Sequence, residues 1–217
     1  MRRQERRATY HHGDLRAALL GTAAELLEEC GASGVSLREI ARRVGVSHAA
    51  PKRHFPDRRA LLTAVAAQGF RELGARLARA RDSSLRARQA PRERLIALGQ
   101  TYGKFVVSKP ALFTIIFRAD QLDAADIAYV TAERAAFDAL KEAVAACQIE
   151  GWNAKVPHDV ATLSVWSIAH GLAMLWTAGV AQRRVAGGAD LAALGLAVGR
   201  ALLMPDRAPA TGRRRAR

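Results

Sequence analysis

Basic residues cluster between positions 38 and 59, and their type and spacing suit the binding of phosphate groups. This 22-residue stretch holds seven basic side chains against two acidic ones, Glu39 and Asp57, and so carries a net charge of +5. Guanidinium and ammonium groups at this density form the kind of face that binds a nucleic-acid backbone. The alternative is a solvated surface on an ordinary pair of helices. The seven basic residues are Arg38, Arg42, Arg43, Lys52, Arg53, Arg58 and Arg59.

Catalytic and metal-binding chemistry has no comparable pattern in the sequence. The six histidines are scattered, and neither a Ser-His-Asp arrangement, nor a metal-ligand cluster, nor a phosphate-binding glycine loop is evident. The adjacent His11 and His12 would not share one face of a helix. We therefore expect no enzyme, no cofactor and no metal site.

The basic stretch lies on a pattern of two short helices joined by a tight turn. Four apolar residues repeat at helical spacing before Gly45, which can end a helix because it adopts a left-handed backbone at little cost. Ser36 can cap the first turn, and Glu39 completes a capping box. A second helix is expected over His48–His54, with Ser47 as its cap. This order is typical of a helix-turn-helix, whose second helix lies in the DNA major groove. The four apolar residues are Leu37, Ile40, Ala41 and Val44.

The expected second helix divides into a base-reading end and a phosphate-binding end. Its first residues are small or can donate hydrogen bonds, which suits contact with base edges. Pro51 is tolerated in the first turn because its missing N–H would have no partner there. A flexible arm over residues 1–9, with four arginines, could lie in the minor groove or contribute nothing. From these patterns the predicted DNA-binding residues are Ser36, Arg38, Ser47, His48, Ala49, Ala50, Lys52, Arg53 and His54.

The region from about Tyr10 to Phe70 resembles the TetR/AcrR family of bacterial transcriptional regulators. Three helices and their connections match in order, through the helix Leu15–Leu27, the tripeptide Cys30-Gly31-Ala32, and the segments SLREIARRVGVSHAAPKRHF and DRRALLTAVA. The family commonly has a basic phosphate contact at the start of the next helix, which implies DNA binding by Arg58. Many relatives carry an aromatic residue where this chain has Lys52. The resemblance then implies a phosphate contact made by a point charge rather than by a flat surface.

The C-terminal part is similar to a subgroup of that family named for a Trp, a His and a Gly. These residues are Trp166, His170 and Gly171 in VWSIAHGLAMLW, and the opening YHHGDLR at Tyr10–Arg16 also looks like that subgroup. The resemblance implies a ligand cavity in the C-terminal domain, and a ligand that moves the connecting helix and lowers DNA affinity. Core packing is the alternative role for each candidate. The candidate ligand-binding residues are Tyr102, Phe105, Phe113, Phe117, Phe137, Trp166, His170 and Met174.

The whole chain is predicted to be all-α, with about nine helices and no strand. We expect a basic arm at 1–9, a three-helix helix-turn-helix DNA-binding domain at 10–57, a helical domain for ligand binding and dimerisation at 58–204, and a basic disordered tail at 205–217. Outside the helix-turn-helix, helices are expected over Asp14–Glu29, Arg58–Arg79, Pro91–Ser108, Ala111–Phe117, Ile127–Glu150 and His158–Val180, with a last helix from Leu191.

The segment His158–Val180 is apolar on nearly every side, which requires burial on every side. We expect it and the last helix to pair with the same helices of a second copy in a four-helix dimer interface. No apolar run is expected to span a membrane and no signal-peptide pattern is present, so the predicted location is the cytoplasm, with nucleoid association when DNA is bound. Cys30 and Cys147 lie in apolar helical patterns and are expected to be buried thiols.

Together these features favour a homodimeric, sequence-specific transcriptional regulator, a repressor released from its operator by an unknown small molecule. Two recognition helices related by a twofold axis would enter successive major grooves about 34 Å apart, so the operator should be a near-palindrome in double-stranded DNA. The net charge of +14 leaves a second interpretation, a sequence-tolerant architectural DNA-binding protein without a ligand.

Overall fold

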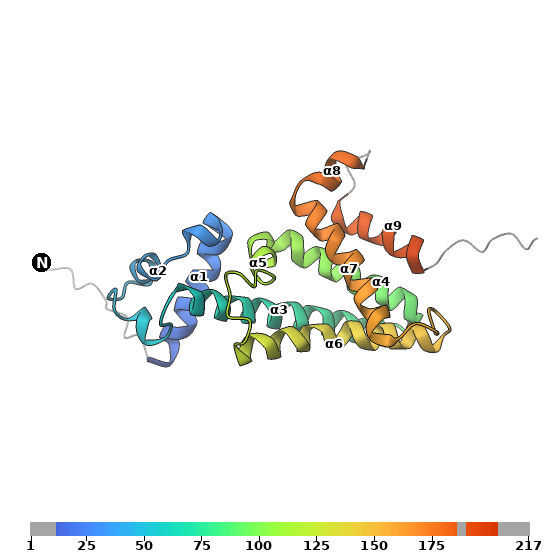
Figure 1. Ribbon diagram of the computed structural model, residues 1–217, viewed down its shortest axis with the longest axis horizontal. Helices are drawn as coiled ribbons and strands as arrows, with labels where there is room; N and C mark the ends of the chain where they lie inside the picture. The colour runs from blue at the N-terminus through green and yellow to red at the C-terminus, as the bar shows by residue number, and fades with distance from the viewer. Residues whose placement is uncertain (1–11, 186–189, 204–217) are drawn as a thin grey trace, which may run out of the picture. The chain divides into compact units, whose positions relative to one another are not determined.

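The computed structural model describes residues 12–185 and 190–203, and most of them lie in helices (Figure 1). These residues form nine α-helices and one short 3-10 helix and contain no strand, which confirms the predicted all-α fold. The predicted arm at 1–9 and tail at 205–217 lie outside them. The elements are α1 (His12–Gly34), α2 (Leu37–Val44), η1 (Pro51–Arg53), α3 (Arg58–Arg86), α4 (Pro91–Ser108), α5 (Pro110–Ile115), α6 (Ile127–Ile149), α7 (His158–Thr177), α8 (Val180–Arg184) and α9 (Leu191–Leu203).

Contacts divide the chain into two units. The first comprises the described residues up to Glu72 together with Lys109–Arg134, and the second comprises Leu73–Ser108 with the described residues from Ala135 onward. The helices α3 and α6 each contribute to both units. This division differs from the expected boundary before Arg58, because the segment that contains α5 packs with the N-terminal helices.

The core of the first unit includes Phe70, whose side chain is fully buried. Phe117 and Tyr129 pack edge-to-face against it, with ring centroids 5.5 and 5.6 Å away. The Tyr129 hydroxyl donates a hydrogen bond to the backbone carbonyl of Ile116 at 2.9 Å. The middle of α3 is therefore packed against the turn after α5 and against the beginning of α6. Other buried side chains of this unit are Leu19, Leu26, Ile40, Phe55, Leu61 and Phe113.

In the second unit, α4 and α9 pack along each other in opposite directions. Gly103 of α4 lies near Leu191 at the start of α9, while Ile96 lies near Gly199 toward its end. A Cβ at Gly199 would be only 3.2 Å from Ile96, so this approach of the helices depends on the missing side chain. At the far end of α9, the Arg92 guanidinium donates to the carbonyl oxygen of Leu203 at 2.9 Å. That bond satisfies one of the carbonyls that a helix end leaves free.

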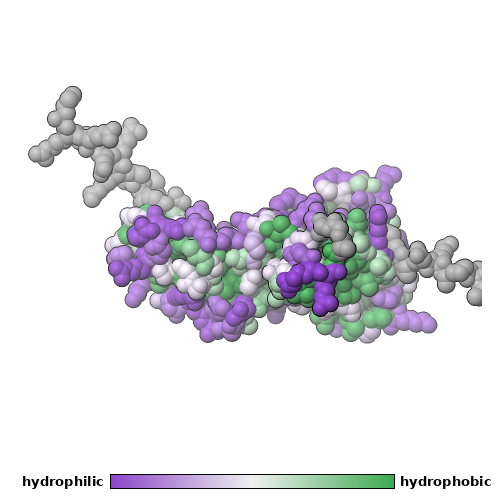
Figure 2. All heavy atoms as spheres, turned by 90° about the horizontal axis from the view of Figure 1, so that it is seen from above, coloured by the Kyte–Doolittle hydropathy of each residue, from purple (hydrophilic) through white to green (hydrophobic). Residues whose placement is uncertain are grey.

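The helix α7 is apolar along its length but largely uncovered in a single copy of the chain. Leu163 is 55% exposed and Leu175 is 49% exposed. Figure 2 shows hydrophobic side chains gathered over the part of the second unit that carries α7 and α9. By length and composition alone, α7 is the one helix of the described residues that could cross a membrane. The expectation that no apolar run reaches that length is therefore wrong, although core helices of soluble proteins pass the same test.

The length of α3 and the exposure of Cys30 differ from the sequence-based expectations. The helix α3 continues to Arg86 through a segment expected to be a loop, where Arg81 pairs with Asp82 and, at 2.8 Å, with Glu142 of α6. Cys30 is exposed on α1, so its predicted burial is wrong, whereas the predicted burial of Cys147 is confirmed.

Candidate functional site

The helix α2 has the predicted cap at each of its ends. The Ser36 hydroxyl oxygen accepts a hydrogen bond from the Glu39 N–H at 3.2 Å. Gly45 is left-handed, with φ 76° and ψ 31°, and the N–H of Val46 donates to the Ala41 carbonyl at 3.0 Å. These bonds satisfy backbone groups that the helix leaves free, and they fix the direction in which the chain leaves α2.

The carboxylate of Glu39 binds arginines instead of completing the predicted capping box. It accepts hydrogen bonds from Arg42 at 2.7 and 2.9 Å and from Arg43 at 3.1 Å. These bonds, the one to Arg42 first and the one to Arg43 second, lower the pKa of Glu39 to about 2. Arg43 also pairs with Glu29 of α1 at 2.7 Å. Two of the seven basic residues in the stretch are therefore held in internal ion pairs.

The predicted second helix is reduced to a single turn of 3-10 helix. The N–H of Ala50 donates to the Ser47 carbonyl at 3.0 Å, and the N–H of His54 donates to the Pro51 carbonyl at 3.0 Å. Both bonds join residues three apart, as in a 3-10 helix. Because Pro51 has no N–H, the four-apart bond from position 51 to Ser47 cannot form. The predicted α-helix over His48–His54 is therefore wrong in type, and Ser47 contributes its carbonyl group to the turn.

This turn is anchored by its apolar side. Pro51 is buried, and Phe55 is only 2% exposed. The guanidinium of Arg16 on α1 lies over the Phe55 ring, 5.2 Å from its centroid. The turn is thus held against α1 while its other side faces solvent.

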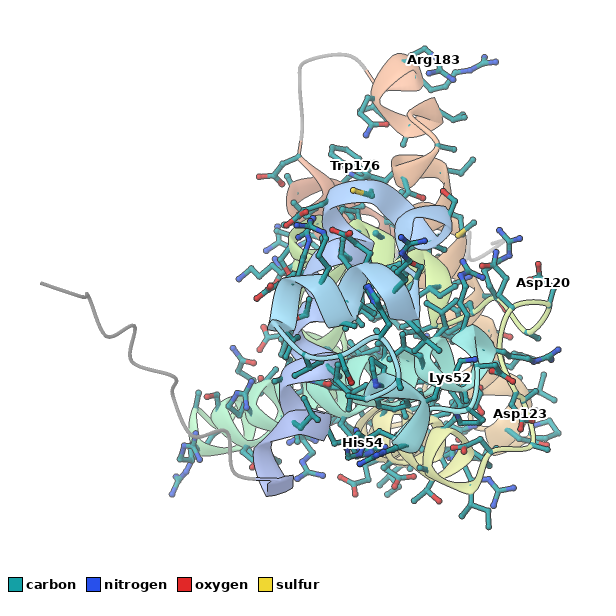
Figure 3. All side chains as sticks on the ribbon, turned by 90° about the vertical axis from the view of Figure 1, so that its left-hand side faces the viewer. Lys52, His54, Asp120, Asp123, Trp176 and Arg183 are labelled. Atoms are coloured by element: carbon teal, nitrogen blue, oxygen red, sulfur yellow. The ribbon has the colours of Figure 1, made fainter. Side chains whose placement is uncertain are left out.

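The solvent side of the turn carries positive charge without an internal counterion. Lys52 and Arg53 are exposed, and within the described residues neither forms an ion pair or a side-chain hydrogen bond. His54 is half-buried beside them, and Figure 3 labels Lys52 and His54 on this side of the first unit. Cations in this state can pair with an external anion without breaking an internal contact. Of the other predicted contacts, Ala50 is half-buried, and the exposed ones are Ser36, Arg38, Ser47, His48 and Ala49.

Arg58 has an internal role beside its predicted DNA contact. Its Nε donates to the Val35 carbonyl at 2.9 Å, and one terminal nitrogen donates to the Ala32 carbonyl. These bonds tie the start of α3 to the end of α1 and to the link between α1 and α2. Asp57 caps α3 by accepting a hydrogen bond from the Ala60 N–H at 2.8 Å, as its position predicts.

A cavity of about 240 Å³ lies between α4, α7 and α9 in the second unit. Its wall is mostly aliphatic, and glycines of α4 and α9 supply part of it. The turn between α6 and α7 adds Trp152 and Asn153. The four glycines that line the cavity are Gly99, Gly103, Gly195 and Gly199.

A smaller cavity of about 60 Å³ adjoins the first, between α3, α4, α6 and α7. Phe137 and Trp166 line it, with their rings edge-to-face at 5.0 Å. Tyr102, Gly99 and Val165 line both cavities. Tyr102 therefore forms part of the wall between them.

The polar groups of this wall are paired with one another. The Tyr102 hydroxyl lies 2.9 Å from Nδ1 of His170, and the Trp166 and His170 rings are 5.3 Å apart. Burial raises the pKa of Tyr102, and a hydrogen bond with Trp166 opposes that rise. Burial lowers the pKa of His170 below its ordinary value of 6.5. At neutral pH the phenol is protonated and the imidazole is neutral, so the hydroxyl can donate to Nδ1.

The predicted ligand-binding residues fall into three groups. Tyr102, Phe137 and Trp166 line one or both cavities. Phe105, His170 and Met174 belong to the same unit but line neither cavity. Phe113 and Phe117 belong to the first unit, with ring centroids 5.6 Å apart, and line neither cavity. For these five the ligand contact stays a prediction. Phe105 and Phe113 are fully buried, as core residues are, and Met174 is exposed.

The glycines of the larger cavity are absent from the sequence-based candidates, which are all large side chains. A signal for them exists in the sequence: Gly99 and Gly103, and likewise Gly195 and Gly199, are four residues apart. Residues at that spacing share a helix face, so each pair leaves a bare strip of backbone.

Two regions of the chain match models of known protein families. Residues 19–65 match the family described as "Bacterial regulatory proteins, tetR family", and residues 95–198 match "Tetracyclin repressor-like, C-terminal domain". The chain belongs to the TetR family of transcriptional regulators. The two matched regions contain the helix-turn-helix and most of the cavity-lining residues of this TetR-family chain, respectively.

Individual proteins share part of the sequence or the fold of this chain. The TetR-family chain is 45% identical over 51 residues to tetracycline repressor protein class C from Escherichia coli, a match that covers 24% of this chain and only 23% of that repressor. A solved protein of unknown function from Rhodococcus sp. RHA1 is 34% identical, with a TM-score of 0.74 over 90% of this chain and 96% of that one. The TetR family transcriptional regulator PfmR from Thermus thermophilus shares the fold, with a TM-score of 0.63 and 18% identity over 85% of this chain and 96% of its own.

Proposed function

We propose that this regulator is a homodimeric repressor that binds a near-palindromic operator and leaves it when a small molecule enters the cavity beside Tyr102. The observation that carries the DNA contact is the exposed charge of Lys52 and Arg53, which lack internal counterions among the described residues. Phosphates can pair with these groups and release counterions from DNA. Such a regulator would work in the cytoplasm, where the chromosomal DNA lies.

Within the DNA contact, we assign base reading to the start of the turn and phosphate binding to its surroundings. Ser47 and His48 are exposed and can donate to base edges, while the Ala49 and Ala50 methyl groups suit a thymine methyl. The proposed phosphate contacts are Ser36, Arg38, Lys52, Arg53, His54 and Arg58.

The proposed dimer forms through α7 and α9. Exposed apolar side chains such as Leu163 and Leu175 need a cover in water, and a patch of this kind is typical of a protein interface. A second copy offers the same helices, so that the two pairs close around a twofold axis. Membrane insertion is the weaker explanation, because Ala161 and Ala173 of α7 are buried by the chain's own helices.

The proposed effector acts through the helices that leave the cavity. Gly99 and Tyr102 of α4 line it, and α4 ends at Ser108, directly before the short link to α5. The carboxylate of Glu28, on α1, holds the first backbone N–H groups of α5. A ligand lowers DNA affinity only if it binds the non-binding arrangement more tightly than the DNA-binding one.

The predicted Trp-His-Gly subgroup remains part of this proposal. Its support is the joint role of Trp166 and His170, which contact each other and Tyr102 at the cavity wall. Gly171 follows His170 on α7, where a Cβ would meet no neighbouring atom within 4 Å among the described residues. The nearby face of α7 therefore has room for a partner.

The experiment that tests the proposal is selection of bound duplexes from a random library, at physiological salt with excess nonspecific DNA. Recovery of one inverted repeat, with half-sites about one helical turn apart, is the expected result. That repeat can then be used to screen compounds for release. Recovery of no sequence above background, with tight binding to all duplexes, would instead favour the architectural interpretation that the charge of +14 also allows.

A further inference from the structure

We infer that the ligand of the larger cavity is an uncharged, mostly hydrocarbon molecule of about ten heavy atoms, seated against the glycine strips of α4 and α9. Its role as an effector rests on the proposed function, whereas its binding can be measured without DNA.

The charge of the ligand follows from the lining. None of the described residues that line either cavity is acidic, basic or a histidine. Arg92 stands at the end of α9 but its guanidinium is bonded to the Leu203 carbonyl, and it does not line the cavity. A carboxylate or ammonium group inside would lose its water shell without gaining a counterion, which opposes binding strongly.

The size of the ligand follows from the cavity volume. An engineered cavity of about 150 Å³ with an apolar lining holds benzene. The larger cavity here is about 240 Å³, so in proportion it holds roughly ten heavy atoms, the size of two fused rings or a compact branched hydrocarbon.

The cavity can recognise a polar group of the ligand only at the end formed by the turn between α6 and α7. The Tyr102 hydroxyl is already bonded to His170, and the Ser164 hydroxyl donates to the Val160 carbonyl at 2.8 Å. The side-chain amide of Asn153 forms no hydrogen bond with the described residues. One neutral hydroxyl or carbonyl group on the ligand can therefore be recognised at the turn between α6 and α7, while the rest contacts carbon.

The glycines keep this space open. A Cβ at Gly99 or at Gly195 would meet no neighbouring atom within 4 Å among the described residues. Gly103 and Gly199 differ, because Leu191 and Ile96 lie 3.5 and 3.2 Å from the Cβ positions and use the missing side chains for helix packing. Gly99 and Gly195 thus bound space that no side chain fills, which is the space we assign to the ligand.

The test is calorimetric titration of the full-length protein with naphthalenemethanol and with naphthoate. The two probes share a fused ring but differ in charge, because the carboxylate is ionised at neutral pH. We expect naphthalenemethanol to bind and naphthoate to bind at least about tenfold more weakly.

Gly195→Leu and Gly99→Leu should each abolish binding of the neutral probe by filling its space. Gly195→Ala should retain it, and Gly21→Leu, on α1, is the control because its Cβ position is equally open and outside the cavity.

Three results would overturn the inference. Equal binding of both probes would show that charge is tolerated. Retained binding in both leucine variants, with unchanged melting behaviour, would place the probe elsewhere. Binding of neither probe would mean that the space is filled in solution, for example by a second copy. Failure of the proposed regulation would give a different result. The protein would bind the neutral probe but would stay on its selected operator.

Discussion

The carboxylate of Glu28 on α1 accepts hydrogen bonds from the backbone N–H groups of Leu112 at 2.9 Å and Ala111 at 3.2 Å. These groups belong to the first turn of α5, which lies more than eighty residues later in the chain. Lys109, at the cap position of α5, makes no side-chain bond to that turn. Glu28 therefore serves as the cap of α5 from another helix, and it attaches the segment after α4 to the helix-turn-helix unit.

Removal of this cap should destabilise the protein. Glu28→Ala leaves the Ala111 and Leu112 N–H groups unbonded in a partly buried place, and we expect a loss of about 1–2 kcal/mol in the free energy of unfolding. Urea denaturation at a fixed protein concentration measures it. Glu25→Ala, one turn earlier on the exposed side of α1, should change stability by less than about 0.5 kcal/mol. Equal effects of the two substitutions would contradict the assigned cap.

Two substitutions should separate phosphate binding from base reading in the 3-10 turn. Arg53→Ala removes an exposed charge, so affinity should fall for all duplexes alike and the salt dependence should weaken by about one phosphate contact. His48→Ala should cost about 1–3 kcal/mol on the selected operator and relax the preference at one base pair. Fluorescence anisotropy on the operator and on mutated operators measures both. A uniform loss for His48→Ala would show that its role is phosphate binding.

A charge on the exposed face of α7 should prevent dimer formation. Leu163→Glu places a carboxylate on the apolar surface proposed to be covered by the second copy, where it would be buried without a partner. We expect a monomer by sedimentation velocity and loss of operator binding. Leu85→Glu on α3 is the matched control, because Leu85 is 49% exposed but lies on another helix. If the Leu163→Glu variant still sediments as a dimer, α7 is not at the centre of the interface.

Stability should fall in mild acid because of His170. Burial lowers the pKa of His170 in the folded protein below its ordinary 6.5, so the unfolded chain binds the proton more readily. The contribution of the neutral imidazole is complete above pH 6.5 and is lost as the pH falls below that value toward the lower folded pKa. Melting temperatures recorded from about pH 8 to about pH 5 should decline, and His170→Gln should flatten that decline. His158→Gln, at an exposed histidine, is the control, and an identical profile for wild type and His170→Gln would refute the assignment.

The parts of the fold that the sequence predicts well are those governed by neighbours in the chain. The Ser36 cap and the left-handed Gly45 depend on groups within four residues, and both are present as expected. The small and basic residues after Ser47 predict a full helix, but the missing N–H of Pro51 limits the segment to a 3-10 turn. Glu28 could not be recognised as a cap, because its partners are distant in sequence.

The cavity was harder to predict, since a helix pattern does not tell which apolar face meets a space and which meets another helix. Large aromatic residues are the candidates that the sequence favours, yet Phe105 and Phe113 are fully buried in the core. The cavity depends instead on the absence of side chains at Gly99 and Gly195. Among the aromatic candidates, only Tyr102 lines both cavities.

The unequal exposure of the two cysteines gives the protein a built-in site for spectroscopic labelling. Cys147 is fully buried, and burial raises its pKa to about 11, so its reactive thiolate form is scarce at neutral pH. Cys30 is exposed on α1, in the helix-turn-helix unit. A maleimide spin label should therefore attach at one position per chain without any engineering. In the proposed dimer, the distance between the two labels would report directly on the separation of the DNA-binding units, with and without a bound ligand.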